Sequence, residues 1–217
     1  MGQIFNMDNK FFQFLNKAVD CVGLSVLWLL CCVPVVTAGA ATTAMYYTVN
    51  KVIRHSRGYV WSEFWHAFRA NFKQSTIAWL IVFAATIFMA MDCYIMYQFA
   101  KAGESIGKMF FVFVVFIALI LMWGIYLFPY IARFENVTKA VLKNAGLIAI
   151  ANLPWTLLLF VLYLISVFVA WLIPPTIMLV PGVYMVLANL VLERVFRKYM
   201  TEEDLAAEEE RNREYFN

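Results

Sequence analysis

The stretch Cys31–Tyr47, CCVPVVTAGAATTAMYY, decides how the first part of the chain meets a membrane. It begins as the end of an apolar run and continues as a proline, a series of small residues and three threonines. Pro34 cannot continue a helix cleanly, Thr37 is a candidate N-cap, and Gly39 tolerates unusual backbone angles. These residues predict a turn, with one helix before it and a second helix over about residues 38–53.

The composition of the chain is that of an integral membrane protein. Hydrophobic residues make up 64% of the 217 residues, and the mean hydropathy of +0.74 lies far outside the range of soluble proteins. Three runs approach or exceed the roughly 18 to 20 residues that cross a hydrocarbon core: Thr76–Ala90 with its flanks, Met109–Ala132 and Leu147–Trp171. Because these runs are apolar on every face, the predicted fold class is an all-α integral membrane protein and not a barrel.

The 17 Lys and Arg residues discriminate between two topologies, because basic residues gather on the cytoplasmic side of a membrane. If residues 21–45 form one span, the chain has five spans and its two sides collect 13 and 4 basic residues. If the chain turns at residues 34–39, both termini share a side and the counts become 15 and 2, with only Lys101 and Lys108 outside. The second arrangement is favoured: about six helical segments, five to six of them transmembrane, with both termini cytoplasmic.

Two alternatives remain at the first hairpin. Each arm has about 16 usable residues, or about 24 Å of helix, and charge counting does not distinguish a hairpin that spans the membrane from a re-entrant one over residues 18–53. The other alternative is a signal peptide cleaved near Ala38-Gly39-Ala40. A long, aromatic and partly acidic region before the apolar run argues against cleavage.

The segment between the first hairpin and the next apolar run, residues 57–73 (RGYVWSEFWHAFRANFK), has an aromatic face of helical spacing. We expect residues 59–73 to form an interfacial helix on the inner leaflet, or a docking surface for a cytoplasmic protein, and the two roles are compatible. The residues of this predicted membrane-interface or docking helix are Trp61, Phe64, Trp65, Phe68, Arg69 and Phe72.

No catalytic, cofactor-binding or metal-binding constellation is visible in the sequence. The four cysteines show no CxxC spacing, and the two histidines lack companions at ligand spacing. Asp92 is the acid that lies well inside an apolar run, and an intramembrane carboxylate is a functional candidate, either in a solute path or paired with Lys101. Asn50 and Asn189 are the accompanying polar candidates. Hydration of Asp92 at the outer surface is the simpler interpretation.

The chain divides into a single transmembrane helical domain, residues 1–200, and an acidic cytoplasmic tail, residues 201–217. The tail has seven acidic residues against two arginines, and Thr201 with Asp204 matches a relaxed capping box. Either the tail is solvated, or it folds against a basic surface such as that around Arg54, Arg57 and Arg69. The basic residues elsewhere flank apolar runs, so they carry topological information and do not indicate nucleic acid.

Several segments together resemble a known family: NKFFQFLNK, LWLLCCVPVVTAGAATTAMYYTVNK, RGYV followed by FWHAFRANFKQS, and LKNAGLIAIANLPW. They resemble the YesL-like family of predicted bacterial membrane proteins, a domain of unknown function, over residues 9–199. The resemblance implies a multi-pass protein of the bacterial cytoplasmic membrane, found alongside carbohydrate uptake and degradation systems. It implies no catalytic or ligand residues.

Two functions follow as hypotheses. The first is a non-catalytic accessory or structural subunit of a solute uptake system, with carbohydrate as the solute class that the resemblance implies. Its partners would be the lipid bilayer and either importer membrane subunits or a cytoplasmic protein, with no cofactor. The alternative is a stand-alone small-solute transporter or channel, which would carry more polar groups within the membrane.

Overall fold

The computed structural model describes residues 10–214, and every regular element within them is helical. The α-helices are α1 Lys10–Cys32, α2 Ala38–Thr48, α3 Val60–Lys101, α4 Phe110–Arg133, α5 Thr138–Ala151, α6 Leu153–Leu172, α7 Val180–Phe196 and α8 Glu202–Glu214. Short 3-10 segments are η1 Val35–Thr37, η3 Ser105–Met109, η4 Pro174–Met178 and η5 Arg197–Tyr199, and a π-helical turn, η2 Val49–Arg54, extends α2. The predicted all-α class is confirmed.

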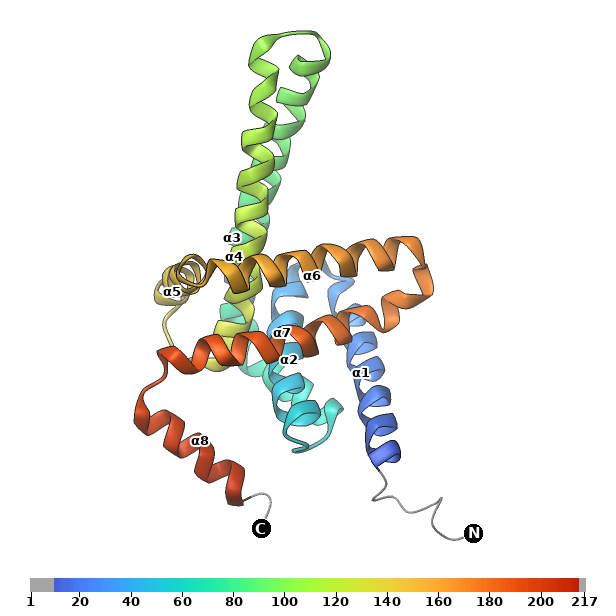
Figure 1. Ribbon diagram of the computed structural model, residues 1–217, viewed down its shortest axis with the longest axis vertical. Coiled ribbons are helices and arrows are strands. Elements are labelled where there is room, and N and C mark those ends of the chain that lie inside the picture. The colour runs from blue at the N-terminus through green and yellow to red at the C-terminus, as the bar shows by residue number, and fades with distance from the viewer. Residues whose placement is uncertain (1–9, 215–217) are drawn as a thin grey trace.

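Three helical hairpins organise the structure (Figure 1). The α1–α2 hairpin packs beside the lower half of α3, and the α3–α4 hairpin extends far beyond the other elements. The α6–α7 hairpin runs crosswise to α3 and α4 at the level where the α1–α2 hairpin ends. These six helices correspond to the six expected helical segments.

Among residues 10–214, four helices are long and apolar enough to cross a membrane, judged by length and composition. They contain the segments Leu15–Cys32, Val60–Lys101, Ser105–Arg133 and Leu153–Leu172. Helices α2 and α7 have 11 and 17 residues, fewer than the roughly 20 that a hydrocarbon core requires. The chain is therefore a membrane protein by its apolar helices, and two of the six segments are short for complete spans.

Residues 60–73 are helical, as expected, but they do not form a separate helix. These residues form the first turns of α3, a continuous helix of 42 residues that is about 63 Å long. No proline or glycine lies between Val60 and Lys101 to interrupt the helix. The charged residues of this segment lower its hydropathy without ending its helical hydrogen bonding.

The apolar run Leu147–Trp171 is divided in the structure. Helix α5 ends at Ala151, and α6 begins at Leu153 with Pro154 in its first turn. Proline lacks the amide hydrogen that a continuing helix would bond to the preceding turn, so the chain changes direction there. The run therefore supplies the end of α5 and most of α6.

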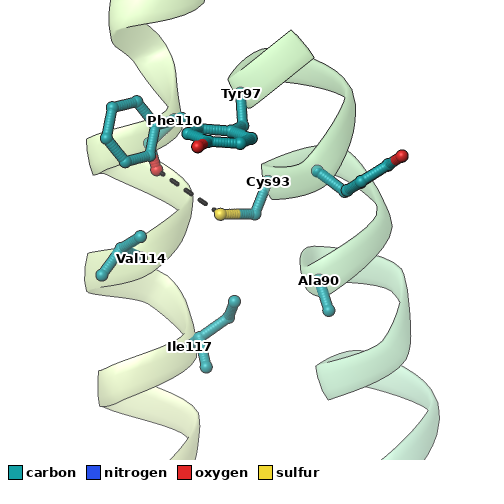
Figure 2. Close-up of a pocket in the computed structure, with 7 residues that line it drawn as sticks. Ala90, Cys93, Tyr97, Phe110, Val114 and Ile117 are labelled. Atoms are coloured by element: carbon teal, nitrogen blue, oxygen red, sulfur yellow. Dashed lines mark hydrogen bonds between the residues drawn. The ribbon is translucent and has the colours of Figure 1, made fainter.

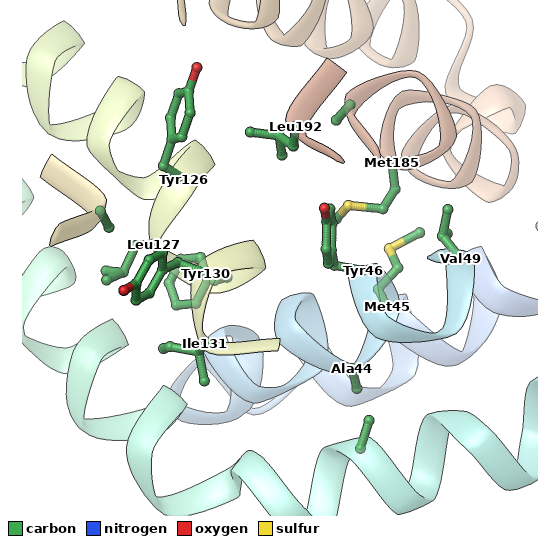
Figure 3. Packing of buried hydrophobic residues seen from close by; sticks show 14 of the residues in the cluster. Ala44, Met45, Tyr46, Val49, Tyr126, Leu127, Tyr130, Ile131, Met185 and Leu192 are labelled. Carbon is green, nitrogen blue, oxygen red and sulfur yellow. The ribbon is translucent and has the colours of Figure 1, made fainter. Parts of the chain in front are cut away.

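The core lies where α2, α3, α4 and α7 meet (Figure 3). Its largest fully buried apolar side chains include Tyr46 of α2, Phe64 of α3, Tyr126 of α4 and Phe196 of α7. The rest of α3 and α4 beyond this junction exposes large apolar side chains, such as Phe88 and Phe111. Such surfaces suit lipid or other membrane helices and not water.

Candidate functional site

The most buried ion pair of the described residues lies at the end of α4. Nη2 of Arg133 is 3.3 Å from Oε2 of Glu193 on α7. The other carboxylate oxygen of Glu193 accepts a 2.9 Å hydrogen bond from the hydroxyl of Tyr46 on α2. Arg133 also pairs with Glu208 on α8. These four residues, here called the Arg133 cluster, connect α2, α4, α7 and α8.

The Arg133 cluster is surrounded by apolar side chains. The Glu193 side chain is only 2% exposed. Phe196 packs edge-on against Tyr46 and Tyr126, with ring centroids 6.4 Å apart in both pairs. Figure 3 shows Tyr46 extending from α2 toward α7 among these buried groups. Because an unpaired charge is costly in such surroundings, each member of the cluster depends on the others, and the cluster fixes the relative positions of its helices.

Two of the predicted polar candidates lie near this region. Asn189 is 1% exposed, and its Oδ1 accepts a 3.2 Å hydrogen bond from Nη1 of Arg54 on η2. Asn50 lies on the same η2 segment, where its backbone oxygen is 2.7 Å from Nδ1 of His55. The hydrogen bond from Arg54 to Asn189 thus holds η2 against α7.

A second ion pair joins the end of the α2–η2 segment to the start of α3. Nζ of Lys51 is 2.8 Å from Oε2 of Glu63 and 3.4 Å from the hydroxyl of Tyr47. Burial alone would lower the pKa of Lys51, but the hydrogen bonds to Glu63 and Tyr47 outweigh it, so the pKa is raised above 10.5. Lys51 is therefore held in its charged form.

Asp92 lies apart from both polar regions. It is on the extended part of α3 and is partly exposed. Its suggested partner Lys101 is nine residues further along the helix, about 13 Å away. Nζ of Lys101 instead lies 4.7 Å from the ring centroid of Tyr97. The expected alternative of an Asp92–Lys101 pair is wrong.

Several buried polar groups of the described residues pair with one another, whereas Oδ1 of Asn50, Nδ2 of Asn189 and the hydroxyl of Tyr184 are buried without a hydrogen-bond partner there. Asn152 donates a 2.8 Å hydrogen bond to the hydroxyl of Tyr199. Hydroxyl–hydroxyl contacts join Thr156 to Tyr126 at 3.1 Å and Thr43 to Ser75 at 2.9 Å, the latter linking α2 and α3. Among residues 10–214, no group of three or more His, Cys, Asp or Glu side chains is placed to hold a metal ion.

A cleft of about 350 Å³ lies between α3 and α4 toward their connecting turn (Figure 2). Its lining is almost entirely apolar and consists of Ala90, Cys93, Tyr94, Tyr97, Phe110, Val114 and Ile117. The Cys93 thiol contacts the backbone oxygen of Phe110 at 3.9 Å, as Figure 2 shows. None of Asn50, Asn189 and Asp92 is among the residues that line this cleft.

The predicted aromatic face of residues 59–73 is split by the structure. Phe64 is fully buried and Trp65 and Phe68 are half-buried, all three packing with the core. Trp61, 64% exposed, and Phe72, 40% exposed, remain on the surface at either end. Arg69 is exposed. The middle of the face thus packs against this chain's own helices, which leaves only its two ends for lipid or a partner.

The predicted turn at Pro34, Thr37 and Gly39 is present, but two of the reasons for it are wrong. Thr37 precedes α2 without capping it through its side chain, and its hydroxyl donates instead to the backbone oxygens of Cys31 and Pro34. Gly39 has ordinary helical geometry within α2. A Cβ atom there would lie 2.5 Å from Cβ of Trp79, so Gly39 is needed for the close approach of α2 to α3.

The tail forms α8, and Thr201 caps it by accepting a 3.2 Å hydrogen bond from the backbone amide of Asp204. Within the part of the chain that the structure describes, Glu208 of α8 pairs with Arg133, a basic residue other than the expected Arg54, Arg57 and Arg69. The sequence did not single out the Arg133 cluster. Its one local signal is the position of Arg133 and Glu193 at the ends of apolar runs, where charged residues are common.

Residues 21–93 match the family described as "Protein of unknown function, DUF624". The matched residues run from α1 through the turn at Pro34 to most of α3. Comparisons with curated proteins and with solved structures find no match. The match is compatible with the YesL-like resemblance over a narrower range. About a third of the chain is thus similar to a family whose description assigns no activity.

Proposed function

We propose that this chain is a non-catalytic accessory subunit of a solute uptake system in the bacterial cytoplasmic membrane, with carbohydrate as the solute class. The carbohydrate assignment rests on the YesL-like resemblance alone. The subunit role rests on the form of the α3–α4 hairpin. The hairpin would pack against the membrane helices of the importer, while helices α2 and α7 of this chain hold it in position.

One observation carries the proposal: the α3–α4 hairpin stands free of the other helices over the half nearest its connecting turn (Figure 1). Its outward side on α3 exposes apolar residues at alternating spacings of three and four, Ile81, Ala84, Phe88, Met91 and Ile95. This spacing forms a seam into which the side chains of another helix can pack, with Ala84 allowing close approach.

The pairing of buried polar groups supports a subunit over a transporter. A solute path through the membrane requires polar groups that face a shared, hydrated space. Asn152, Thr156 and Oδ1 of Asn189 each bond to another group of this chain, and over residues 10–214 the unpartnered buried amide atoms are Nδ2 of Asn189 and Oδ1 of Asn50. The cleft beside Cys93 has an apolar lining.

Photo-crosslinking in native membranes tests the proposal. A benzophenone amino acid at Phe88 should give an adduct with a membrane subunit of an importer. The same probe at Val82, which is on α3 but buried, is the matched control and should give none. Adducts of the Phe88 probe with lipid alone, in cells that are actively taking up the solute, would contradict the proposal.

A further inference from the structure

The three hairpin turns differ in charge. The connection between α3 and α4 has Lys101, Glu104 and Lys108, all of them exposed. In contrast, no charged residue occurs from Leu153 to Leu192, which covers the whole α6–α7 turn. The α1–α2 turn also lies in an uncharged stretch, residues 21–50. Only the α3–α4 turn has the composition of a segment that emerges into water.

The side chains at the α6–α7 turn are apolar and uncovered. Trp171 is 75% exposed, and Ile173, Met178 and Leu179 are also exposed. Large apolar side chains are stable in such positions when hydrocarbon surrounds them. The composition of this turn therefore suits the interior of a lipid layer.

The backbone of both uncharged turns is largely satisfied internally, as hydrocarbon requires. In η4, the amide of Thr176 bonds to the oxygen of Ile173, and the amide of Leu179 bonds to the oxygen of Thr176, both at 2.9 Å. Pro174 and Pro175 have no amide hydrogen to satisfy. In the α1–α2 turn, the indole of Trp79 donates a 2.7 Å hydrogen bond to the oxygen of Val35.

That bond also fixes the height of the α1–α2 turn against α3. From Trp79 to Lys101, α3 continues for about 33 Å, and a hydrocarbon core is about 30 Å thick. The part of α3 beyond the α1–α2 turn is therefore sufficient to cross the core. Because the charged Lys101 belongs in the headgroup layer, the α1–α2 turn then lies at the inner edge of the core, among the acyl-chain segments nearest the headgroups on the side where α3 begins.

The α6–α7 hairpin leaves α4 at the same height. The hydroxyl of Thr156, near the start of α6, is 3.1 Å from the hydroxyl of Tyr126 on α4. Two residues further along α4, Phe128 packs on Trp79 with ring centroids 6.1 Å apart. From there α6 runs crosswise to the α3–α4 hairpin (Figure 1). An apolar helix that is crosswise to a spanning hairpin lies along the membrane plane.

We propose that only the α3–α4 hairpin crosses the membrane, and that the α1–α2 turn and the α6–α7 hairpin are embedded in the leaflet on the side of both termini. The acyl chains of that leaflet cover α6 and the turn at η4. Exposed basic residues of α3, α5 and α7 complement anionic headgroups: Arg69, Lys73, Lys139, Lys143 and Arg194. The arrangement keeps the 15-to-2 distribution of basic residues, because the embedded hairpins contribute none to the outside.

Cysteine accessibility tests the topology. In a variant whose four native cysteines are replaced by alanine, single cysteines would be placed at Ala102, Val35, Met178 and Lys139. An impermeant maleimide applied to intact cells should label Ala102→Cys only. Applied to inside-out vesicles, it should label Lys139→Cys. Labelling of Met178→Cys or Val35→Cys from outside, at the rate of Ala102→Cys, would overturn the proposal.

Nitroxide labels at the same positions identify the occupant of the embedded surface. The purified chain would be placed in vesicles of phosphatidylethanolamine and phosphatidylglycerol. Oxygen should relax the labels at Val35 and Met178 more than a water-soluble nickel chelate does, and the order should reverse at Ala102. Protection from both relaxants at Met178 would mean that protein covers this turn, and would overturn acyl chains as the occupant. Ile177→Cys and Val36→Cys serve where the first variants fold poorly.

Discussion

Nη2 of Arg133 lies 3.3 Å from Oε2 of Glu193, and these residues join the end of the projecting α3–α4 hairpin to the crosswise helix α7. Glu193 is bonded on its other oxygen to Tyr46 of α2. One carboxylate thus holds three helices from all three hairpins. The orientation of the α3–α4 hairpin relative to α2 and α7 depends on this buried contact.

Replacing Glu193 by alanine should destabilise the protein strongly. The change leaves the Tyr46 hydroxyl buried without its acceptor and Arg133 with Glu208 alone, and loss of one partner of a buried pair costs about 3 to 5 kcal/mol. Thermal unfolding of the detergent-purified protein, followed by cysteine exposure, should show a markedly lower midpoint. The exposed Glu203→Ala is the control, with an expected change below about 0.5 kcal/mol. Equal midpoints for the two variants would contradict a structural role for the cluster.

Two glycines provide a matched test of the contact between α2 and α3. A Cβ at Gly39 would lie 2.5 Å from Cβ of Trp79 and 2.6 Å from the backbone oxygen of Ser75, so Gly39→Ala must push the helices apart. A Cβ at Gly124, within α4, meets nothing within 4 Å. We expect Gly39→Ala to lower the unfolding midpoint by the equivalent of about 1 to 3 kcal/mol, and Gly124→Ala to leave it unchanged or raise it. A neutral Gly39→Ala would show that α2 and α3 are not closely packed.

The fold class could be predicted from the sequence because apolar runs of this length are stable only as helices in lipid. The turn at Pro34 could also be predicted, since proline acts on its own neighbours. The direction of α6 relative to the membrane could not be predicted. A run that is apolar on every face, such as residues 153–172, has the same sequence pattern whether it crosses the membrane or lies along it.

The Arg133 cluster shows why the buried polar contacts could not be predicted from the sequence. Tyr46 and Glu193 are 147 residues apart in the chain, and neither is unusual among its sequence neighbours. The aromatic face of residues 59–73 was identified by its period, but the period does not tell whether protein or lipid covers it. In the structure its middle, around Phe64, packs within this chain's own core.

Alkaline pH should weaken the contact between η2 and α3. The folded state raises the pKa of Lys51 above 10.5, so the contribution of the Lys51–Glu63 pair is complete below about pH 10.5 and is lost as the pH rises beyond it. The unfolding midpoint of the unmodified protein should therefore fall more steeply above this pH than that of Lys51→Met. Lys139→Met, which removes an exposed lysine, should behave like the unmodified protein. Parallel alkaline curves for all three proteins would contradict the prediction.

The tail helix should be released by loss of one carboxylate. Glu208 pairs with Arg133, whereas Glu210 is exposed, so Glu208→Gln and Glu210→Gln form a matched pair on the same helix. Hydrogen exchange of the α8 amides should become faster in Glu208→Gln and stay unchanged in Glu210→Gln, because only the first change removes the contact that docks α8. High salt should accelerate exchange in the unmodified protein by screening the same contact, and should have less effect on Glu208→Gln. Exchange that is equally slow in both variants at low salt would mean that Arg133 does not hold α8, and that the carboxylate of Glu193 is its only functional partner.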